Sequence, residues 1–216
     1  MKHLIYFLMI VDHAGWLFYP NEMWIRFIGH IFLPMFIYFP VLGLQQTKQP
    51  VSYITKLLKW ALITQAILIG FWSLNDTFFL GKINILFTLS WGLIMLTLIK
   101  EIPDIEKEIA LIFIITAHLF NFEYGAFAVW GMYLFYFRNK MPNYRWWIMW
   151  SAALTLGMLE TLGFVIFAAI LPPHIIFRIQ KRLKMRRIIP KLPSGFWYAY
   201  YPAQFAILMT AYQIIN

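Results

Sequence analysis

The stretch IVDHAGWLFYPNEMWIRFIGHIFLPMFIYFPVLG, residues 10–43, places ionisable side chains inside two long apolar runs. The short segment YPNE, residues 19–22, separates the two runs, so the stretch predicts two helices joined by a tight turn. A helix needs roughly 20 apolar residues to cross the hydrocarbon core of a bilayer. We therefore expect a transmembrane hairpin with polar groups in its interior.

The rest of the chain has the same apolar character. Apolar residues make up 62% of the 216 residues and charged residues 12%, and the mean hydropathy is +0.67. These values exclude an ordinary soluble globular protein. We expect an all-α, polytopic membrane bundle that forms one domain over residues 1–216. About nine spans fit, within a range of eight to ten, and they lie near residues 4–19, 23–45, 54–74, 83–99, 108–121, 124–137, 146–160, 163–177 and 196–214.

The formal net charge of +9 does not indicate a nucleic-acid partner, because the basic residues flank the apolar runs. If the N-terminus is cytoplasmic, strict alternation of the spans leaves only Lys82 in an outer loop, and Arg26 lies within a span. Basic residues on the cytoplasmic side are typical of multi-pass membrane proteins. The pattern also predicts a basic cytoplasmic loop at residues 178–195.

The same charge rule predicts two further hairpins. Lys107 and Arg138 bound residues 108–137, so this segment should turn back at NFEYG, residues 121–125. A second turn is expected near ETLG, residues 160–163. Helices of about 15 residues rise only about 22 Å, which is short for a full crossing. Such hairpins are expected to tilt, to thin the bilayer locally or to be re-entrant, and a re-entrant hairpin would leave NFEYG and its Glu123 at membrane depth.

The ionisable residues of the first hairpin are candidates for catalysis. A charged side chain at the bilayer centre costs about 3 kcal/mol and usually faces a functional path. Arg26 and His30 are spaced to share one helix face, whereas Asp12 and His13 point about 100° apart. We expect Asp12 to pair with Arg26 and His13 to face a cavity. The alternative is a buried ion pair that only fixes the register of the hairpin.

Other polar residues of the predicted spans extend this candidate site. Glu123 is a further catalytic candidate, and Gln65 and Asn84 are candidates for binding a cofactor in the same cavity. The alternative for Gln65 and Asn84 is hydrogen bonding between helices, a common role of small polar side chains in membranes. We expect no metal site, because the chain has no cysteine and no HExxH motif.

The basic loop is a candidate phosphate-binding segment. Clustered guanidinium and ammonium groups bind phosphate well. The alternative is an amphipathic segment on the inner membrane surface. The candidate ligands for the phosphates of a cytoplasmic cofactor are Arg178, Lys181, Arg182, Arg186 and Arg187.

Five motifs, in order along the chain, carry a resemblance to a known family. Residues 10–43 hold a DHIG-like motif followed by an R-x-x-G-x-x-x-F-P-x-F-like stretch. ALITQ at 61–65, INILFTLSWGL at 83–93, FEYGAFAV at 122–129 and WYAYYPAQFAIL at 197–208 follow. Together they resemble the TraX family of conjugal-transfer membrane proteins. Gln204 departs from the pattern, because the resemblance places a histidine at this position of the last span.

The resemblance implies an acetyltransferase of the bacterial inner membrane. Its implied substrates are acetyl-CoA and the N-terminal amine of a pilin subunit. In this interpretation His13 is the general base or carries the acetyl group, and Arg26 or His30 stabilises the oxyanion. Two alternatives stay open, namely an O-acetyltransferase of a surface polysaccharide and a non-enzymatic transporter or subunit of an export apparatus.

Overall fold

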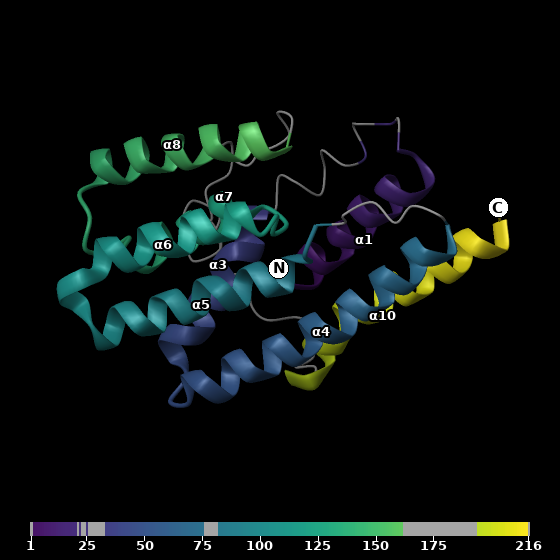
Figure 1. The fold of residues 1–216 in the computed structure, drawn as a ribbon, viewed down its shortest axis with the longest axis horizontal. Coiled ribbons are helices and arrows are strands. Elements are labelled where there is room, and N and C mark those ends of the chain that lie inside the picture. Colours follow the sequence, from purple (N-terminus) through teal and green to yellow (C-terminus); the bar gives the residue numbers. More distant parts are fainter. Residues whose placement is uncertain are drawn as a thin grey trace, which may run out of the picture.

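The described part of the chain is folded almost entirely into α-helices. The computed structural model describes residues 2–20, 22, 25, 33–75, 82–161 and 194–215. Within these ranges lie eight α-helices and one 3₁₀ helix, η1 (Figure 1). The all-α fold class predicted from the sequence is confirmed. The elements are α1 (Lys2–Phe18), α3 (Leu33–Gln46), α4 (Pro50–Leu74), α5 (Ile85–Glu101), η1 (Pro103–Ile105), α6 (Glu106–Leu119), α7 (Gly125–Tyr136), α8 (Asn143–Thr161) and α10 (Ser194–Ile215).

The helices lie where the apolar runs predicted them. Helix α4 begins at Pro50, four residues before its predicted span, and α6 begins at Glu106, two residues before its predicted span, because a helix can continue past its apolar part. The predicted span at 163–177 lies outside the described residues, and the turn at 160–163 lies partly outside them. The predicted runs 54–74, 83–99, 108–121 and 124–137 coincide with α4, α5, α6 and α7.

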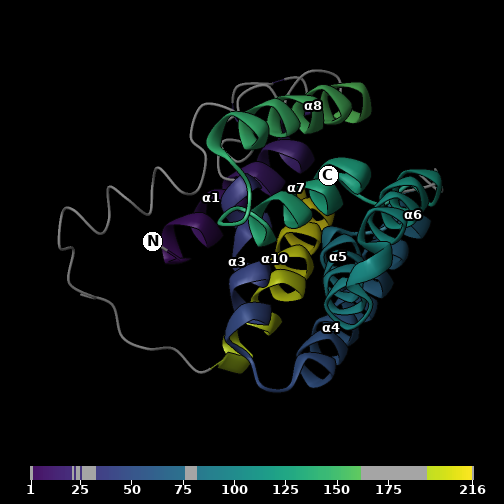
Figure 2. The same cartoon turned by 90° about the vertical axis from the view of Figure 1, so that its left-hand side faces the viewer.

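Helix α7 forms the centre of the bundle. It packs against α3, α5, α6 and α8 (Figure 2). Ten of its twelve residues are buried, so it contributes to the core on every side. Helix α4 packs against both α5 and α10, and α10 packs against α1. The C-terminal helix therefore lies beside the N-terminal one.

Helices α1, α4 and α10 run in the same direction. Tyr53 near the start of α4 meets Tyr198 near the start of α10, with ring centroids 6.5 Å apart. Phe71 and Tyr212 meet near the ends of the same two helices at 5.6 Å. Phe18 at the end of α1 lies 5.8 Å from the ring of Tyr212. This shared direction agrees with the alternation predicted for the first, third and last spans.

The turn between α6 and α7 is tight. Asn121 and Tyr124 have φ angles of 54° and 55°, which few residues other than glycine adopt. A Cβ atom on Gly125 would lie 2.6 Å from the carbonyl oxygen of Ala117, so only glycine fits there. The helical hairpin predicted at NFEYG is confirmed.

The α6–α7 turn contacts the start of α5, and the start of α5 contacts the middle of α4. Phe122 forms an isolated parallel bridge with Ile83, and the adjacent Asn84 bonds to Gln65 of α4. Gln65 precedes Leu74, the end of α4, by nine residues, a rise of about 13 Å. The α6–α7 hairpin therefore ends well short of the end of α4.

The connections α3–α4, α5–α6 and α7–α8 all lie on the left-hand side of the bundle in Figure 1. Lys82 precedes α5 and lies at the opposite end. This grouping matches the one-sided distribution of basic residues predicted from the sequence. The exposed basic residues in or near the three connections are Lys48, Lys56, Lys59, Lys100, Lys107, Lys140 and Arg145.

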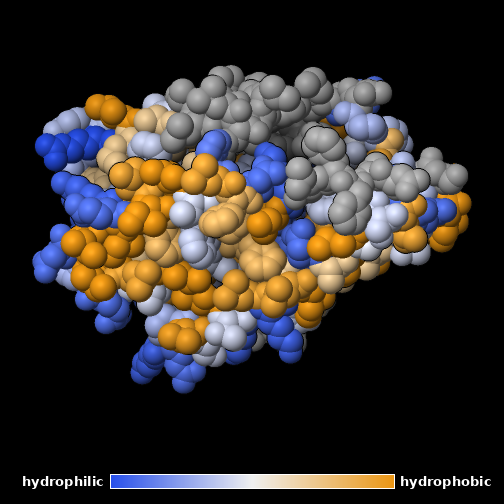
Figure 3. All heavy atoms as spheres, viewed as in Figure 1, coloured by the Kyte–Doolittle hydropathy of each residue, from blue (hydrophilic) through white to orange (hydrophobic). Residues whose placement is uncertain are grey.

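Large apolar side chains remain exposed on several helices. Figure 3 shows hydrophobic surface over much of one side of the bundle. By length and composition, α4 is the one described helix that could cross a membrane, and two shorter apolar helices cover Phe7–Phe18 and Gly125–Tyr136. The expectation of about nine spans therefore stays a prediction. The exposed apolar residues include Leu62, Ile63 and Ile69 of α4, Leu111, Ile112 and Ile115 of α6, Trp147 and Ile148 of α8, and Ile207 of α10.

Candidate active site around His13

His13 on α1 contacts the helix at the other end of the chain. Its Nδ1 atom lies 2.9 Å from Nε2 of Gln204 on α10. Gln204 is buried, with 4% of its surface exposed, whereas His13 is partly exposed. An interior amide therefore holds one edge of the imidazole, and Nε2 of His13 lies on the opposite edge of the ring.

Two aromatic residues of α10 complete the packing around the imidazole. The ring centroid of Phe205 lies 4.3 Å from that of His13. Tyr201 approaches the imidazole edge-on, with centroids 5.7 Å apart. Tyr201, Gln204 and Phe205 share one face of α10 because they are spaced by three and four residues. This face fixes the plane of the His13 ring.

Two buried polar atoms of this face have no hydrogen-bond partner in the described part of the chain. They are the hydroxyl of Tyr201 and Oε1 of Gln204. A buried polar group without a partner costs about 1–3 kcal/mol, so such atoms call for a specific explanation. Both residues contact His13, which places two unsatisfied groups beside a partly exposed imidazole.

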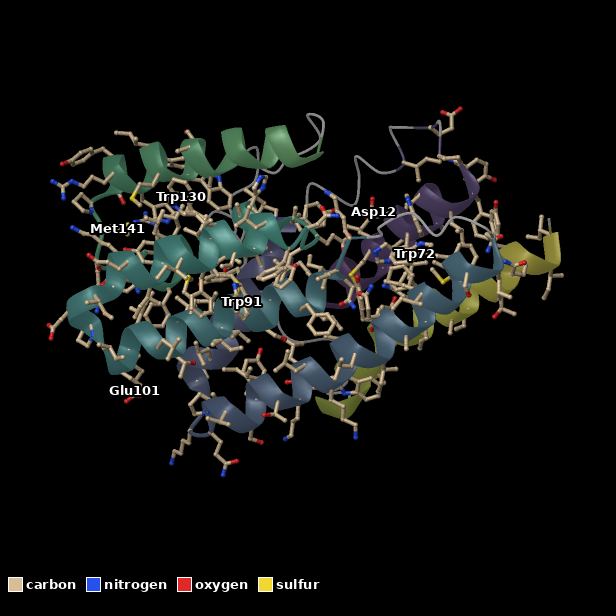
Figure 4. All side chains as sticks on the ribbon, in the orientation of Figure 1. Asp12, Trp72, Trp91, Glu101, Trp130 and Met141 are labelled. Atoms are coloured by element: carbon tan, nitrogen blue, oxygen red, sulfur yellow. The ribbon has the colours of Figure 1, made fainter. Side chains whose placement is uncertain are left out.

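Two carboxylates lie near this cluster. The Tyr201 hydroxyl is within electrostatic reach of both Asp12 and Glu123. Asp12 lies on α1 (Figure 4), and Glu123 lies in the α6–α7 turn. Both carboxylates therefore lie in the neighbourhood of Tyr201, whose ring contacts His13.

Glu123 also has a clear structural role. Its Oε2 atom accepts a hydrogen bond of 2.9 Å from the backbone N–H of Ile85, in the first turn of α5. Its backbone carbonyl accepts a bond of 2.8 Å from the Thr88 hydroxyl. A carboxylate at a helix N-terminus satisfies an otherwise unpaired N–H group and interacts favourably with the helix dipole. The catalytic role expected for Glu123 stays a prediction.

Asn84 and Gln65 tie α5 to α4. The Asn84 side chain caps α5 by accepting from the N–H of Leu86 at 3.1 Å. Its Nδ2 donates to Oε1 of Gln65 and to the carbonyl oxygen of Ala61, both at 2.9 Å. These contacts are of the interhelical kind that formed the alternative interpretation. Cofactor binding by Asn84 and Gln65 stays a prediction.

The chemistry available here is proton transfer by an imidazole. A neutral imidazole accepts protons near neutral pH, which suits a general base. Within the described ranges, no group of three His, Asp or Glu side chains is placed to hold a metal ion.

Comparison with known proteins identifies the family. The profile described as TraX protein matches residues 1–211. The chain belongs to the TraX family. This TraX chain is also 26% identical over 214 residues to the probable fimbrial assembly protein FimC, serogroup H1, of Dichelobacter nodosus. The similarity covers 93% of this chain and 82% of that protein. No solved structure matches the chain.

Several predicted site residues of this TraX protein lie outside the described residues. Arg26 and His30 are among them, so the expected pair of Asp12 with Arg26 stays a prediction. The five basic residues expected to bind phosphate lie outside as well, namely Arg178, Lys181, Arg182, Arg186 and Arg187.

The predicted site did not include Tyr201 and Gln204. One signal for Gln204 was available, because it stands where the TraX resemblance places a histidine. Tyr201 lies within the WYAYYPAQFAIL motif at 197–208, but nothing in that motif distinguished it from the other tyrosines of the chain. Their contact with His13 depends on the packing of α1 against α10.

Proposed function

We propose that this TraX protein is an integral membrane acetyltransferase. It moves an acetyl group from cytoplasmic acetyl-CoA to the N-terminal amine of an exported pilin subunit. The observation that carries the proposal is the position of His13, held between Gln204, Tyr201 and Phe205 in a chain of the TraX family.

The exposed apolar side chains support a location in the membrane. A soluble protein would bury most such residues, whereas in a bilayer they face lipid. They occur on α4, α6, α8 and α10, so they surround much of the bundle. The basic residues near the connections on one side fit the cytoplasmic surface. In this arrangement the protein crosses the inner membrane several times.

His13 is the proposed general base. The acceptor nitrogen attacks the thioester carbonyl carbon, and Nε2 of His13 takes a proton from that nitrogen. The C–S bond then breaks, and the same proton passes to the departing thiolate, which leaves as coenzyme A. Positioned acid–base catalysis contributes about 10²–10⁴-fold to such reactions.

The donor and the acceptor reach His13 from opposite sides in this proposal. Acetyl-CoA enters from the cytoplasm, where the basic segment at 178–195 would hold its phosphates. The pilin terminus enters from the outer side. The relative named as a fimbrial assembly protein supports a pilin subunit as the acceptor.

The test uses the full-length protein in lipid nanodiscs with labelled acetyl-CoA. We expect transfer of the label to a pilin peptide with a free N-terminus and none to the same peptide with a blocked N-terminus. Transfer to a polysaccharide hydroxyl alone would show a different acceptor. Absence of acetyl-CoA binding by calorimetry would contradict the enzyme and favour a transporter or a scaffold.

A further inference from the structure

We propose that Gln204 is a positioning residue that sets which imidazole nitrogen of His13 carries the proton, by turning its side-chain amide. This inference rests on the proposed function of His13 as a base. It concerns a residue of α10 that the predicted site did not include.

With the amide oriented as in this structure, the contact corresponds to one protonation state of His13. A glutamine nitrogen can only donate, so Nε2 of Gln204 donates to Nδ1 of His13 at 2.9 Å. A neutral imidazole whose Nδ1 accepts a hydrogen bond carries its proton on Nε2. In this state Nε2 of His13 is a donor and cannot take a proton from an acceptor amine.

The unsatisfied oxygen of Gln204 provides the second state. Its Oε1 atom is buried and has no hydrogen-bond partner in the described part of the chain. A half-turn of the amide exchanges the nitrogen and oxygen positions. Oε1 then accepts from a protonated Nδ1, and Nε2 of His13 presents its lone pair. A catalytic imidazole commonly depends on such an acceptor to fix its tautomer.

The second state is also the one that the reaction needs. When Nε2 of His13 takes the proton of the amine, both ring nitrogens carry hydrogens. Oε1 of Gln204 remains paired with Nδ1–H throughout this step. In the first state, the amide N–H of Gln204 would face the Nδ1–H of the charged imidazole. Two donors facing each other are unfavourable. The amide orientation therefore distinguishes a resting histidine from a reactive one.

Several other groups lie near the imidazole in the described part of the chain or are predicted there. Tyr201 and Phe205 face His13 from α10 through their rings. Asp12 is the neighbour of His13 on α1, and Glu123 lies within electrostatic reach of Tyr201. Arg26 and His30 lie outside the described residues. Gln204, by contrast, contacts a ring nitrogen of His13 at a hydrogen-bond distance of 2.9 Å.

Two substitutions separate the amide's roles. Gln204→Glu keeps the shape and offers only acceptor oxygens, so it should fix the proton on Nδ1. Gln204→Met keeps similar length and offers neither a donor nor an acceptor of comparable strength. Thr210→Val is the matched control on α10, because the Thr210 hydroxyl is exposed and bonds only to the carbonyl of Ala206 in the same helix, at 2.7 Å.

The experiment records ¹⁵N spectra of histidine-labelled full-length protein in nanodiscs, with His13→Gln used to assign the His13 signals. We expect Nδ1 protonation in Gln204→Glu, and a changed tautomer ratio in Gln204→Met. Thr210→Val should match the wild type. We also expect Gln204→Glu to retain acetyl transfer, with the acid limb of its pH–rate profile moved to higher pH. Gln204→Met should lose about tenfold to a hundredfold in transfer rate.

The two readouts separate this inference from the proposed function. Identical His13 spectra in the wild type, Gln204→Glu and Gln204→Met would overturn the role of Gln204, even if all three transferred acetyl groups. Spectra that change as expected, without acetyl transfer by any protein, would support the positioning role and contradict the enzyme. If Gln204→Met misfolds, the His13 spectra and the transfer rate of Gln204→Glu still distinguish these outcomes.

Discussion

The Glu123 carboxylate accepts a hydrogen bond of 2.9 Å from the backbone N–H of Ile85. A residue of the α6–α7 turn therefore caps the N-terminus of α5, a helix that packs against α4. The contact joins the α6–α7 hairpin to the start of α5. Glu123 is also within electrostatic reach of Tyr201, whose ring contacts His13.

Replacing Glu123 should reveal this capping role. We expect Glu123→Ala to lower the free energy of unfolding by about 1–2 kcal/mol, because the Ile85 N–H loses its acceptor. Glu123→Gln keeps an acceptor oxygen and should cost less. Glu101→Gln, an exposed residue at the end of α5 (Figure 4), is the control. Denaturant unfolding in detergent measures all three, and equal stability of Glu123→Ala and the wild type would exclude a capping role.

Gly125 in the tight α6–α7 turn should not tolerate a side chain. Gly125→Ala should destabilise the protein by about 1–3 kcal/mol, because the new Cβ would meet the backbone of Ala117. Gly70→Ala in α4 is the matched control, since a Cβ there would have no neighbour within 4 Å. We expect the control to be unchanged or slightly more stable. Thermal unfolding in detergent compares them, and a stable Gly125→Ala protein would show that the turn can open.

Asn84 offers a test of two interpretations. Asn84→Ala removes the bonds to Gln65 and Ala61, and we expect a loss of stability of about 1–3 kcal/mol. Acetyl-CoA affinity, measured by calorimetry on the fraction that remains folded, should stay near that of the wild type if Asn84 only joins α4 to α5. A tenfold loss of affinity in folded protein would instead support the cofactor role predicted from the sequence.

Gln204→His tests the departure from the family pattern. Glutamine and neutral histidine both carry a donor and an acceptor, so either can serve both tautomers of His13. We therefore expect Gln204→His to retain acetyl transfer within about tenfold of the wild type, unlike Gln204→Met. Steady-state rates across pH measure this. Loss of transfer in a folded Gln204→His protein would show that the amide itself is required.

The helix positions could be predicted because apolar run length is a local property. The hairpin at 121–125 could be predicted as well, because the charge rule for membrane proteins places Lys107 and Arg138 on the same side. The partner of His13 could not, because Gln204 lies 191 residues away and the contact depends on which helices pack together. Likewise, the place of Glu123 in a predicted turn did not indicate that its carboxylate would cap α5.

The most direct test of the account compares acetyl transfer by the wild type and His13→Gln in nanodiscs. Both receive saturating labelled acetyl-CoA and a pilin N-terminal peptide, with Thr210→Val as the control. We expect His13→Gln to lose about a hundredfold or more in rate, while it still folds and the control keeps the wild-type rate. Transfer by His13→Gln at the wild-type rate would contradict a catalytic role for His13.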